Sequence, residues 1–546
     1  MAYSSTPEGS THQTKRIPII GGETIGSNVL WGTTELSDTA KGARFINCYP
    51  KRLELVNTDD KWVLTKCPSI VSETLTFTGS GTDPIRCVSS DGRYIWKGRR
   101  LYLRDLTVTL QYTDVNDLNV KSMFEAVNPS GTDKLYTGIA KNMGTGQMFS
   151  YQYNATTNTF TLSAAISFLE TSDSNPFQSV FFNGRLFCVG NNGRLYNTPP
   201  GNYTTWNSTN FTVPEFRGDA LTAITLYKNY LVAFSTASIE FYIDGAVELG
   251  SPLVRQDAYI QLYNVRYPRN ICQLGDNIFF LSYEDQFGYG VYTIDNFNVK
   301  RVSNFYVDTL LNNEDVIGIS PLSTTLHLAD FYGDPIVMFN AAFAGNLYVA
   351  EGYYDPVTTP TYVSAANPLQ GYPYICLSGK HRQWFDFYFS NDAGYNWSLF
   401  PTSNFFQLAP NSVGDLWRTH FVTTYGAAGS VTWQYFSKDY SGANPTTAEV
   451  YFDINDFGSN LWKHVKYVDA VGDFGNNTVS LSWTPNRDYT SWVPYVPRVQ
   501  STLGYKNAIR WHNLGRHRGS AYKMKFVGTT NIMLEGLEVN YNLGTN

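Results

Sequence analysis

The chain has 546 residues, a formal net charge of −6 and only 16% charged residues, below the roughly 25% of ordinary soluble domains. Aromatic residues make up 16%, and 44 glycines and 24 prolines supply turns, so the composition is that of an all-β protein. The mild acidity argues against a general nucleic-acid binder, because neutralising phosphates requires clustered cations. It does not exclude DNA that passes through a channel, where tight adhesion would hinder movement.

The six cysteines are widely scattered, without a CxxC pair or the spacing of a zinc site. We expect them to be small buried side chains in a reducing cytosol. The N-terminus lacks the apolar segment of a signal peptide, and no run of about 18 apolar residues predicts a membrane-spanning helix.

Residues 1–74 are predicted to form an N-terminal arm followed by extended strands. The first fifteen or so residues are polar, and an extended segment, Ile17–Gly22, follows them. Two later segments, Arg44–Pro50 and Cys67–Ser69, contain prolines, which favour an edge or meandering path over a central strand.

Residues 75–406 repeat one form, in which an apolar strand, a tight polar turn and a second apolar strand follow one another. Asp91-Gly92 and Asn183-Gly184 are strong hairpin signals within this region. Such turns recur at roughly 40–50 residues, the period of a four-stranded propeller blade, which predicts a β-propeller of about six blades. A string of β-sandwich domains is the competing interpretation, because sandwiches also consist of short strands and turns.

Residues 407–546 contain longer strands, such as Val431–Phe436, and are predicted to form a C-terminal β-sandwich. Within them, Val479–Trp483, Ala508–His512 and Tyr522–Phe526 alternate with period two or lie beside turns, and none resembles a reaction centre.

A segment at residues 390–397 is similar to the Asp-box of sialidases and related propellers, with Asn396 where threonine is usual. In such a turn the Asp caps backbone amides and the Trp packs beneath, so its role is structural. The residues concerned are Ser390, Asp392, Gly394 and Trp397.

No pattern in the sequence predicts a catalytic, cofactor-binding or metal-binding residue. A sialidase needs three converging arginines, a Tyr/Glu pair and an acid. Arg217, Arg255 and Arg266 are available, but their spacing does not single them out. His512 and His517 lie near each other without a Cys, Asp or Glu partner.

A basic cluster near the C-terminus is the main candidate interface. Tyr522, Met524 and Phe526 alternate with lysines, which predicts one solvent-facing row of lysines on a strand. A solvated face or a protein–protein contact is favoured over contact with a phosphate backbone. The cluster consists of Lys506, Arg510, Arg516, Arg518, Lys523 and Lys525, with no carboxylate in sequence until Glu535.

Segments at both ends resemble a known viral family. Ile17–Gly22, Arg44–Pro50 and Leu64–Ser69 are similar to the opening of the packaged-DNA stabilisation, tail accessory or nozzle, proteins of short-tailed bacteriophages. Arg487–Trp492 and Arg510–Gly515 are similar to that family's closing pattern. Lys51 replaces an acidic residue, Cys67-Pro68-Ser69 replaces Thr-Pro-Gly, and the hairpin glycine of the closing pattern is missing.

The resemblance implies a non-enzymatic protein of the virion tail, made in the host bacterial cytoplasm. It implies a ring, usually a homohexamer, below the portal and its adaptor, that extends the DNA channel, helps retain the packaged genome and anchors fibres, spikes or a needle. The implied partners are further copies, the adaptor and portal proteins, those tail appendages, and double-stranded DNA passing without sequence specificity. A propeller glycosidase or a glycan- or receptor-binding protein of sialidase-like type is the alternative.

Overall fold

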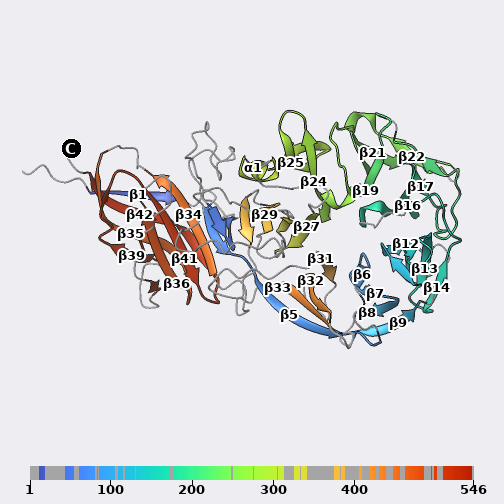
Figure 1. Cartoon of the computed structure of the whole chain (residues 1–546), viewed down its shortest axis with the longest axis horizontal. Helices are drawn as coiled ribbons and strands as arrows, with labels where there is room; N and C mark the ends of the chain where they lie inside the picture. Colours follow the sequence, from blue (N-terminus) through green and yellow to red (C-terminus); the bar gives the residue numbers. More distant parts are fainter. Residues whose placement is uncertain are drawn as a thin grey trace, which may run out of the picture.

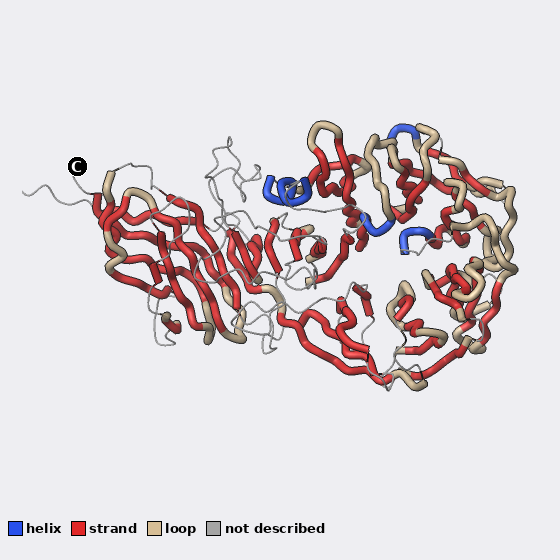
Figure 2. Tube along the Cα trace, in the orientation of Figure 1, coloured by secondary structure: helices blue, strands red, loops and turns tan. Residues whose placement is uncertain are grey.

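The computed structural model describes residues 12–18, 44–53, 61–79, 83–303 with short gaps, 305–312, 325–340 and 374–387 with one short gap each, 405–408, 418–425, 430–437, 447–455, 461–484, 493–500 with one short gap, and 508–543. Strands dominate these residues, as Figure 2 shows. One short α-helix, α1 (Phe305–Asn312), and three single-turn 3-10 helices, Pro176–Gln178, Asp257–Tyr259 and Pro268–Asn270, accompany them. The protein is therefore an all-β protein, as the composition predicts.

Six small antiparallel sheets and four antiparallel strands of a larger sheet form the seven blades of a β-propeller, and Figure 1 shows them in a circle. Six of the blades follow one another along the chain between residues 85 and 387. Blade 1 contains β6 (Ile85–Val88), β7 (Tyr94–Lys97), β8 (Arg100–Leu103) and β9 (Thr109–Thr113). Blade 2 contains β10 (Leu118–Val120), β11 (Phe124–Ala126), β12 (Leu135–Asn142), β13 (Met148–Asn154) and β14 (Thr159–Leu162). Blade 3 contains β15 (Ser179–Phe182), β16 (Arg185–Val189), β17 (Leu195–Asn197) and β18 (Phe211–Thr212).

The remaining three of these six blades follow the same order of strands. Blade 4 contains β19 (Leu221–Tyr227), β20 (Tyr230–Ser235), β21 (Ile239–Asp244) and β22 (Leu253–Arg255). Blade 5 contains β23 (Ile271–Leu274), β24 (Asn277–Glu284), β25 (Gly288–Asp295) and β26 (Asn298–Arg301). Blade 6 contains β27 (Thr325–Asp330), β28 (Pro335–Asn340), β29 (Tyr374–Ser378) and β30 (Trp384–Phe387).

The turns explain why the local hairpins could be predicted. Asn183 and Gly184 connect β15 and β16 with φ of 46° and 73°, the positive values that a tight two-residue hairpin turn requires. Asp91 lies in the turn between β6 and β7, where its Oδ1 accepts a hydrogen bond from Ser89 Oγ at 2.6 Å. Each blade then buries apolar side chains against the next, such as Phe234 of blade 4 against Phe280 of blade 5.

The seventh blade joins two distant parts of the chain. It contains β31 (Phe405–Leu408), β32 (Arg418–Tyr425) and β33 (Ser430–Ser437), completed by β5 (Ser69–Thr76). β5 and β33 pair over eight residues, from Ser69 opposite Ser437 to Thr76 opposite Ser430. The described propeller therefore has seven blades, one more than the prediction of about six. The predicted limits at residues 74/75 and 406/407 both cut through this sheet.

The sandwich is built from both ends of the chain. Its first sheet has the order β3 (Cys48–Leu53), β4 (Lys61–Lys66), β42 (Met533–Leu543), β35 (Lys463–Asp473) and β39 (Ala508–His512). In addition, β1 (His12–Pro18) pairs with β42, and β40 (Arg516–His517) pairs with β35. Its second sheet has the order β2 (Arg44–Ile46), β34 (Thr447–Asn455), β41 (Ser520–Val527), β36 (Thr478–Thr484) and β37 (Val493–Pro494), with β38 (Arg498–Val499) also on β36.

One apolar core continues from the propeller into the sandwich. Phe279 of blade 5, Phe385 of blade 6 and Val468 of the sandwich belong to the same buried cluster. Tyr49 of β3 stacks on Phe385 with ring centroids 5.1 Å apart. β2 also pairs with β30 in parallel, which links the blade 6 sheet to the second sheet of the sandwich. Because protein interiors are close-packed, this shared core makes the junction stiff.

Candidate functional site: the basic edge of the sandwich

The fold divides the predicted basic cluster between the two sheets of the sandwich. Arg510 and Arg516 lie on β39 and β40, at one edge of the first sheet, and Arg518 follows directly. Lys523 and Lys525 lie on β41, in the middle of the second sheet. Lys506 lies outside the described residues. We call the following exposed residues the basic edge: Trp462, His464, Arg510, His512, Arg516 and Arg518.

Arg510 is held by a carboxylate on the neighbouring strand. β35 and β39 pair so that Asp469 lies opposite Arg510, and Arg510 Nε and Nη2 donate to Asp469 Oδ1 and Oδ2, each at 2.6 Å. The guanidinium carbon also lies 3.8 Å from the centroid of the Tyr467 ring. The hydrogen bond that Arg510 donates to Asp469 raises the pKa of Arg510 further above its usual range. The guanidinium is therefore permanently charged and fixed in direction, while its side chain remains 41% exposed.

Two further arginines gather on an exposed tryptophan. The guanidinium carbons of Arg516 and Arg518 each lie 5.4 Å from the centroid of the Trp462 ring. Trp462 itself is 39% exposed. An arginine near an aromatic face is attracted by the ring quadrupole. Exposed Trp and Arg are also the side chains most enriched among the energetic centres of protein interfaces.

A buried histidine lies beneath this surface. His517 of β40 is 1% exposed and packs on Trp483 of β36 with ring centroids 4.7 Å apart. Neither its ring nitrogens nor Trp483 Nε1 has a hydrogen-bond partner among the described residues. Burial, and then the Lys463 ammonium, lower the pKa of His517 to about 4. His517 is therefore neutral at pH 7 and is separated from the exposed His512.

The two lysines of β41 correct one prediction. Tyr522, Met524 and Phe526 face the core as expected, but Lys523 does not face solvent, because its side chain is only 8% exposed. Lys523 Nζ and Lys525 Nζ lie 3.5 and 3.6 Å from the carboxylate oxygens of Glu449 on β34. Tyr451 also donates to that carboxylate, at 2.9 Å. The predicted row of solvent-facing lysines is instead a largely buried ion cluster.

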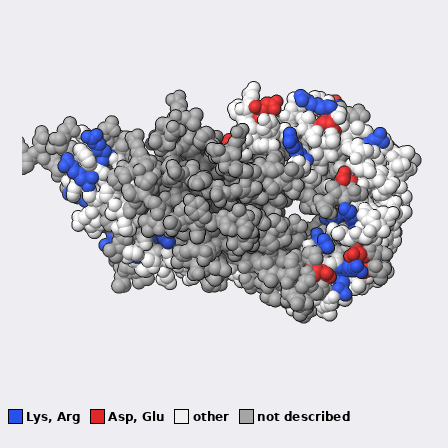
Figure 3. All heavy atoms as spheres, viewed as in Figure 1, with Lys and Arg blue, Asp and Glu red and all other residues white. Residues whose placement is uncertain are grey.

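The surface around the basic edge carries more bases than acids. Figure 3 shows Lys and Arg, and no Asp or Glu, on the described surface at that end of the sandwich in this view. Three described carboxylates of the sandwich are in ion pairs: Glu449 and Asp469 as above, and Glu535 with Arg16 at 3.5 Å. This region is thus positive in a chain whose formal net charge is −6.

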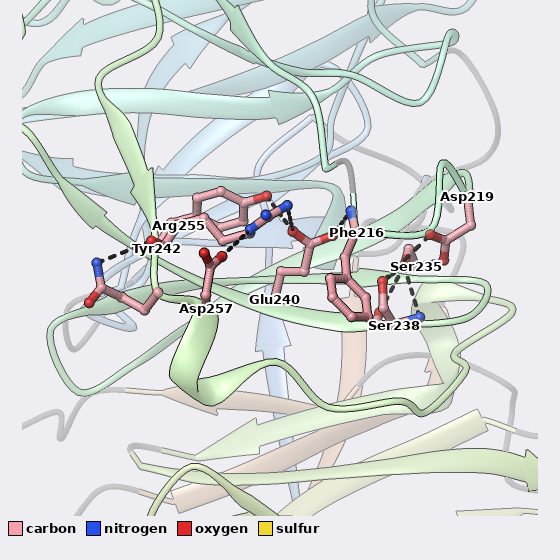
Figure 4. A network of polar contacts seen from close by, with 9 residues as sticks. Phe216, Asp219, Ser235, Ser238, Glu240, Tyr242, Arg255 and Asp257 are labelled. Carbon is pink, nitrogen blue, oxygen red and sulfur yellow. Dashed lines mark hydrogen bonds and ion pairs between the residues drawn. The ribbon is translucent and has the colours of Figure 1, made fainter.

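The propeller contains a polar network that the sequence did not single out (Figure 4). Glu240 on β21 is buried, accepts a hydrogen bond from Tyr242 Oη at 2.9 Å and lies 3.4 Å from Arg255 Nη1 on β22. Arg255 Nε donates to Asp257 Oδ1 at 2.7 Å. Glu240 and Tyr242, two residues apart on one strand, therefore share a face, a signal that was available in the sequence Ser238–Asp244.

That network resembles a catalytic Tyr/Glu pair only in composition. Tyr242 is 2% exposed and packs in the apolar cluster between blades 3 and 4, and Glu240 is 1% exposed. In the same view Asp219 accepts hydrogen bonds from Ser235 Oγ at 2.5 Å and from the Ala237 amide at 2.6 Å, which fixes the turn between β20 and β21. The arrangement braces blade 4 and offers a substrate no access to Glu240.

The other predicted sites can be placed briefly. The Asp-box-like residues Ser390, Asp392, Gly394 and Trp397 lie outside the described residues. All six cysteines are buried and free, as expected. Within the described ranges, no group of His, Cys, Asp or Glu could hold a metal ion, and no helix is long and apolar enough to cross a membrane.

The described residues thus form a seven-bladed propeller joined through one core to a β-sandwich, and that sandwich carries a basic and aromatic edge. Residues 135–320, from blade 2 to beyond α1, match the model of the family described as bacteriophage P22 Gp10, β-propeller. The match covers about a third of the chain and supports a phage structural protein. A comparison with curated proteins found no match.

Solved structures similar to this chain include proteins of diverse activity. An exo-β-1,3-galactanase from Phanerochaete chrysosporium is 12% identical with a TM-score of 0.25, covering 86% of this chain and 100% of the other. The N-terminal domain of Nup159 is 9% identical with a TM-score of 0.34, covering 68% and 95%. Porphyromonas gingivalis dipeptidyl peptidase 4 is 10% identical with a TM-score of 0.29, covering 77% and 64%. With TM-scores below 0.5, these likenesses support no conclusion about activity.

Proposed function

We propose that this protein is a nozzle or head-completion component of a phage tail, without enzymatic activity. In this role copies form a ring, a homohexamer, below the portal and its adaptor. The ring extends the DNA channel, helps retain the packaged genome, and anchors fibres, spikes or a needle. The observation that carries the proposal is the match of residues 135–320 to the phage P22 Gp10 propeller family.

The mechanics of the fold support this role. Among the described strands, the outer edges of the blades β9, β14, β18, β22 and β26 are no longer than five residues, and the propeller core continues into the sandwich, so the subunit is a stiff wedge. Stiff subunits with one contact surface at each side build closed rings through heterologous interfaces. The basic edge offers one such surface, because it presents exposed Trp462 between Arg516 and Arg518.

DNA passage fits the charge distribution of the described residues. On the described surface in Figure 3, the propeller shows bases interspersed with carboxylates, and the sandwich end shows bases without visible carboxylates. A duplex moving through a channel requires few persistent phosphate contacts, because each contact releases counterions and strengthens retention. Lys523 and Lys525 are paired with Glu449, so we do not propose them as DNA contacts.

The alternative of a propeller glycosidase or glycan-binding protein finds no support in the polar network of blade 4, because Glu240 and Tyr242 are inaccessible. Electron microscopy and native mass measurement of the purified chain, alone and with its adaptor and portal partners, test the proposal. We expect a closed sixfold ring around a channel about as wide as duplex DNA. A stable monomer that cleaves glycosides and does not assemble with those partners would refute it.

A further inference from the structure

A projecting hairpin of blade 5 carries an exposed apolar surface. β24 and β25 are eight residues each, and Figure 1 shows their hairpin standing out from the propeller. Phe287, at its tip, is 62% exposed, and Tyr283 is 36% exposed. Leu262, in the segment before β23, is 54% exposed. Large apolar side chains gathered at the surface mark interaction sites.

The hairpin tip is held firmly from below. Arg301 Nη2 donates to the carbonyl oxygens of Phe287 and Tyr289, each at 3.3 Å, and its guanidinium carbon lies 5.6 Å from the centroid of the Phe287 ring. Asn264 Nδ2 donates to the Tyr283 carbonyl at 2.6 Å, and the Tyr283 ring lies 5.0 Å from that of Tyr289. A preorganised surface loses little conformational entropy on binding.

The same tip carries two carboxylates in addition to the Arg301 guanidinium that holds it from below. Glu284 and Asp285 follow Tyr283 directly, and Asp285 is exposed. Figure 3 shows Asp and Glu at the part of the propeller rim where Figure 1 places this hairpin. We call the following residues the aromatic hairpin: Tyr283, Glu284, Asp285 and Phe287.

The aromatic hairpin and the basic edge complement each other in charge and in chemistry. Carboxylates and aromatic rings on the hairpin are the groups that bind guanidinium ions, through charge-assisted hydrogen bonds and cation–π contacts. The basic edge supplies the guanidinium ions, those of Arg516 and Arg518, beside the exposed ring of Trp462. Figure 1 places the β24–β25 hairpin on the propeller and β39 in the sandwich, on separate parts of the molecule, so one chain cannot satisfy both.

We propose that the aromatic hairpin of one copy binds the basic edge of a second copy of this chain. Because the two surfaces differ, the contact is heterologous, and its repetition produces a ring when the rotation closes. This inference rests on the proposed ring and assigns its subunit contact. Glu284 and Asp285 of one copy pair with Arg516 and Arg518 of the next, while Phe287 packs beside Trp462.

Charge reversal on each surface tests the contact. One variant carries Glu284→Lys and Asp285→Lys, and a second carries Arg516→Glu and Arg518→Glu. Because each reversal places like charges together, each variant alone is expected to need an about 100-fold higher concentration to assemble. A mixture of the two variants should assemble, because every contact in an alternating ring then joins opposite charges. Assembly is measured by native mass and electron microscopy.

A matched control reverses two exposed arginines elsewhere on the propeller. Arg93→Glu with Arg99→Glu makes the same change of charge on blade 1, where the side chains are 58% and 53% exposed. This control should assemble like the wild type. Rings from both reversal variants at wild-type concentrations would overturn the contact and leave the proposed function standing. A mixture that fails to assemble would also overturn it, whereas a wild-type chain that forms no ring even with its adaptor would defeat the proposed function itself.

Discussion

Acid should weaken the sandwich through one buried histidine. An unperturbed histidine has a pKa of about 6.5, and burial lowers that of His517 to about 4 in the folded chain. Between these pH values the unfolded chain binds more protons than the folded chain. The free energy of unfolding is therefore undiminished by this group above about pH 6.5, and it decreases as the pH falls towards 4. For one such group the loss between pH 7 and pH 5 is about 2 kcal/mol.

The assay compares denaturation midpoints at pH 7 and pH 5 for the wild type, His517→Phe and His512→Gln. Phenylalanine keeps the contact with Trp483 and removes two ring nitrogens that lack partners, so His517→Phe should be at least as stable at pH 7. It should also lose less stability at pH 5 than the wild type. His327 keeps its share of the acid response, because burial lowers its pKa to about 4 too.

His512 is the matched control, because it is exposed on the same edge of the sandwich. Its replacement should leave the acid response unchanged. If His517→Phe and the wild type lose equal stability between pH 7 and pH 5, the argument that burial of His517 causes this acid sensitivity is refuted.

Three further outcomes can be measured on the same chain. Glu449→Gln removes the buried carboxylate that lies 3.5 Å from Lys523 Nζ and should cost about 3–5 kcal/mol, seen as an earlier denaturation midpoint; adding Lys523→Met should recover most of it. Asp469→Asn should cost less than about 1 kcal/mol by the same measurement, because its partner Arg510 is substantially exposed. All six cysteines should resist a thiol reagent until denaturant is added, because their burial blocks access; fast native labelling would contradict their burial.

Local features of the propeller could be predicted because their causes are local. The Asn183-Gly184 turn encodes its own positive φ angles, and the period of such turns gives six blades between residues 85 and 387. The seventh blade could not be predicted this way. β5 and β33 are separated by more than 350 residues, and no turn signal connects strands that pair at such a distance.

The candidate site shows the same limit at the level of side chains. The sequence contains no carboxylate between Lys506 and Glu535, and it predicts that the lysines of this span form a solvent-facing row. Pairing across strands nevertheless places Asp469 opposite Arg510 and Glu449 opposite Lys525. The alternation along β41 correctly assigned the core-facing side chains, but what covers the other face depends on the whole fold.

The strand order leads to a last prediction about how the chain can be divided. The family-like segments at the two ends lie in one sandwich, because β1 pairs with β42 over seven residues and β2 pairs with β34. A fragment of residues 407–546 would lack β1 to β4 and would separate β33 from β5. Its β42 would then expose an unpaired edge, which promotes aggregation.

We therefore expect the 407–546 fragment to be insoluble when expressed alone. Co-expression of residues 1–68 with residues 438–546 should give a higher soluble yield than the 407–546 fragment, because this pair restores the strands of both sandwich sheets and leaves the seventh blade out entirely. The pair still lacks the blade 6 residues that cover Tyr49, so its yield should stay below that of the full chain. Solubility and far-UV circular dichroism distinguish the outcomes. A soluble, β-rich 407–546 fragment with a cooperative unfolding transition would contradict this prediction. It would show that the C-terminal strands fold without the N-terminal strands.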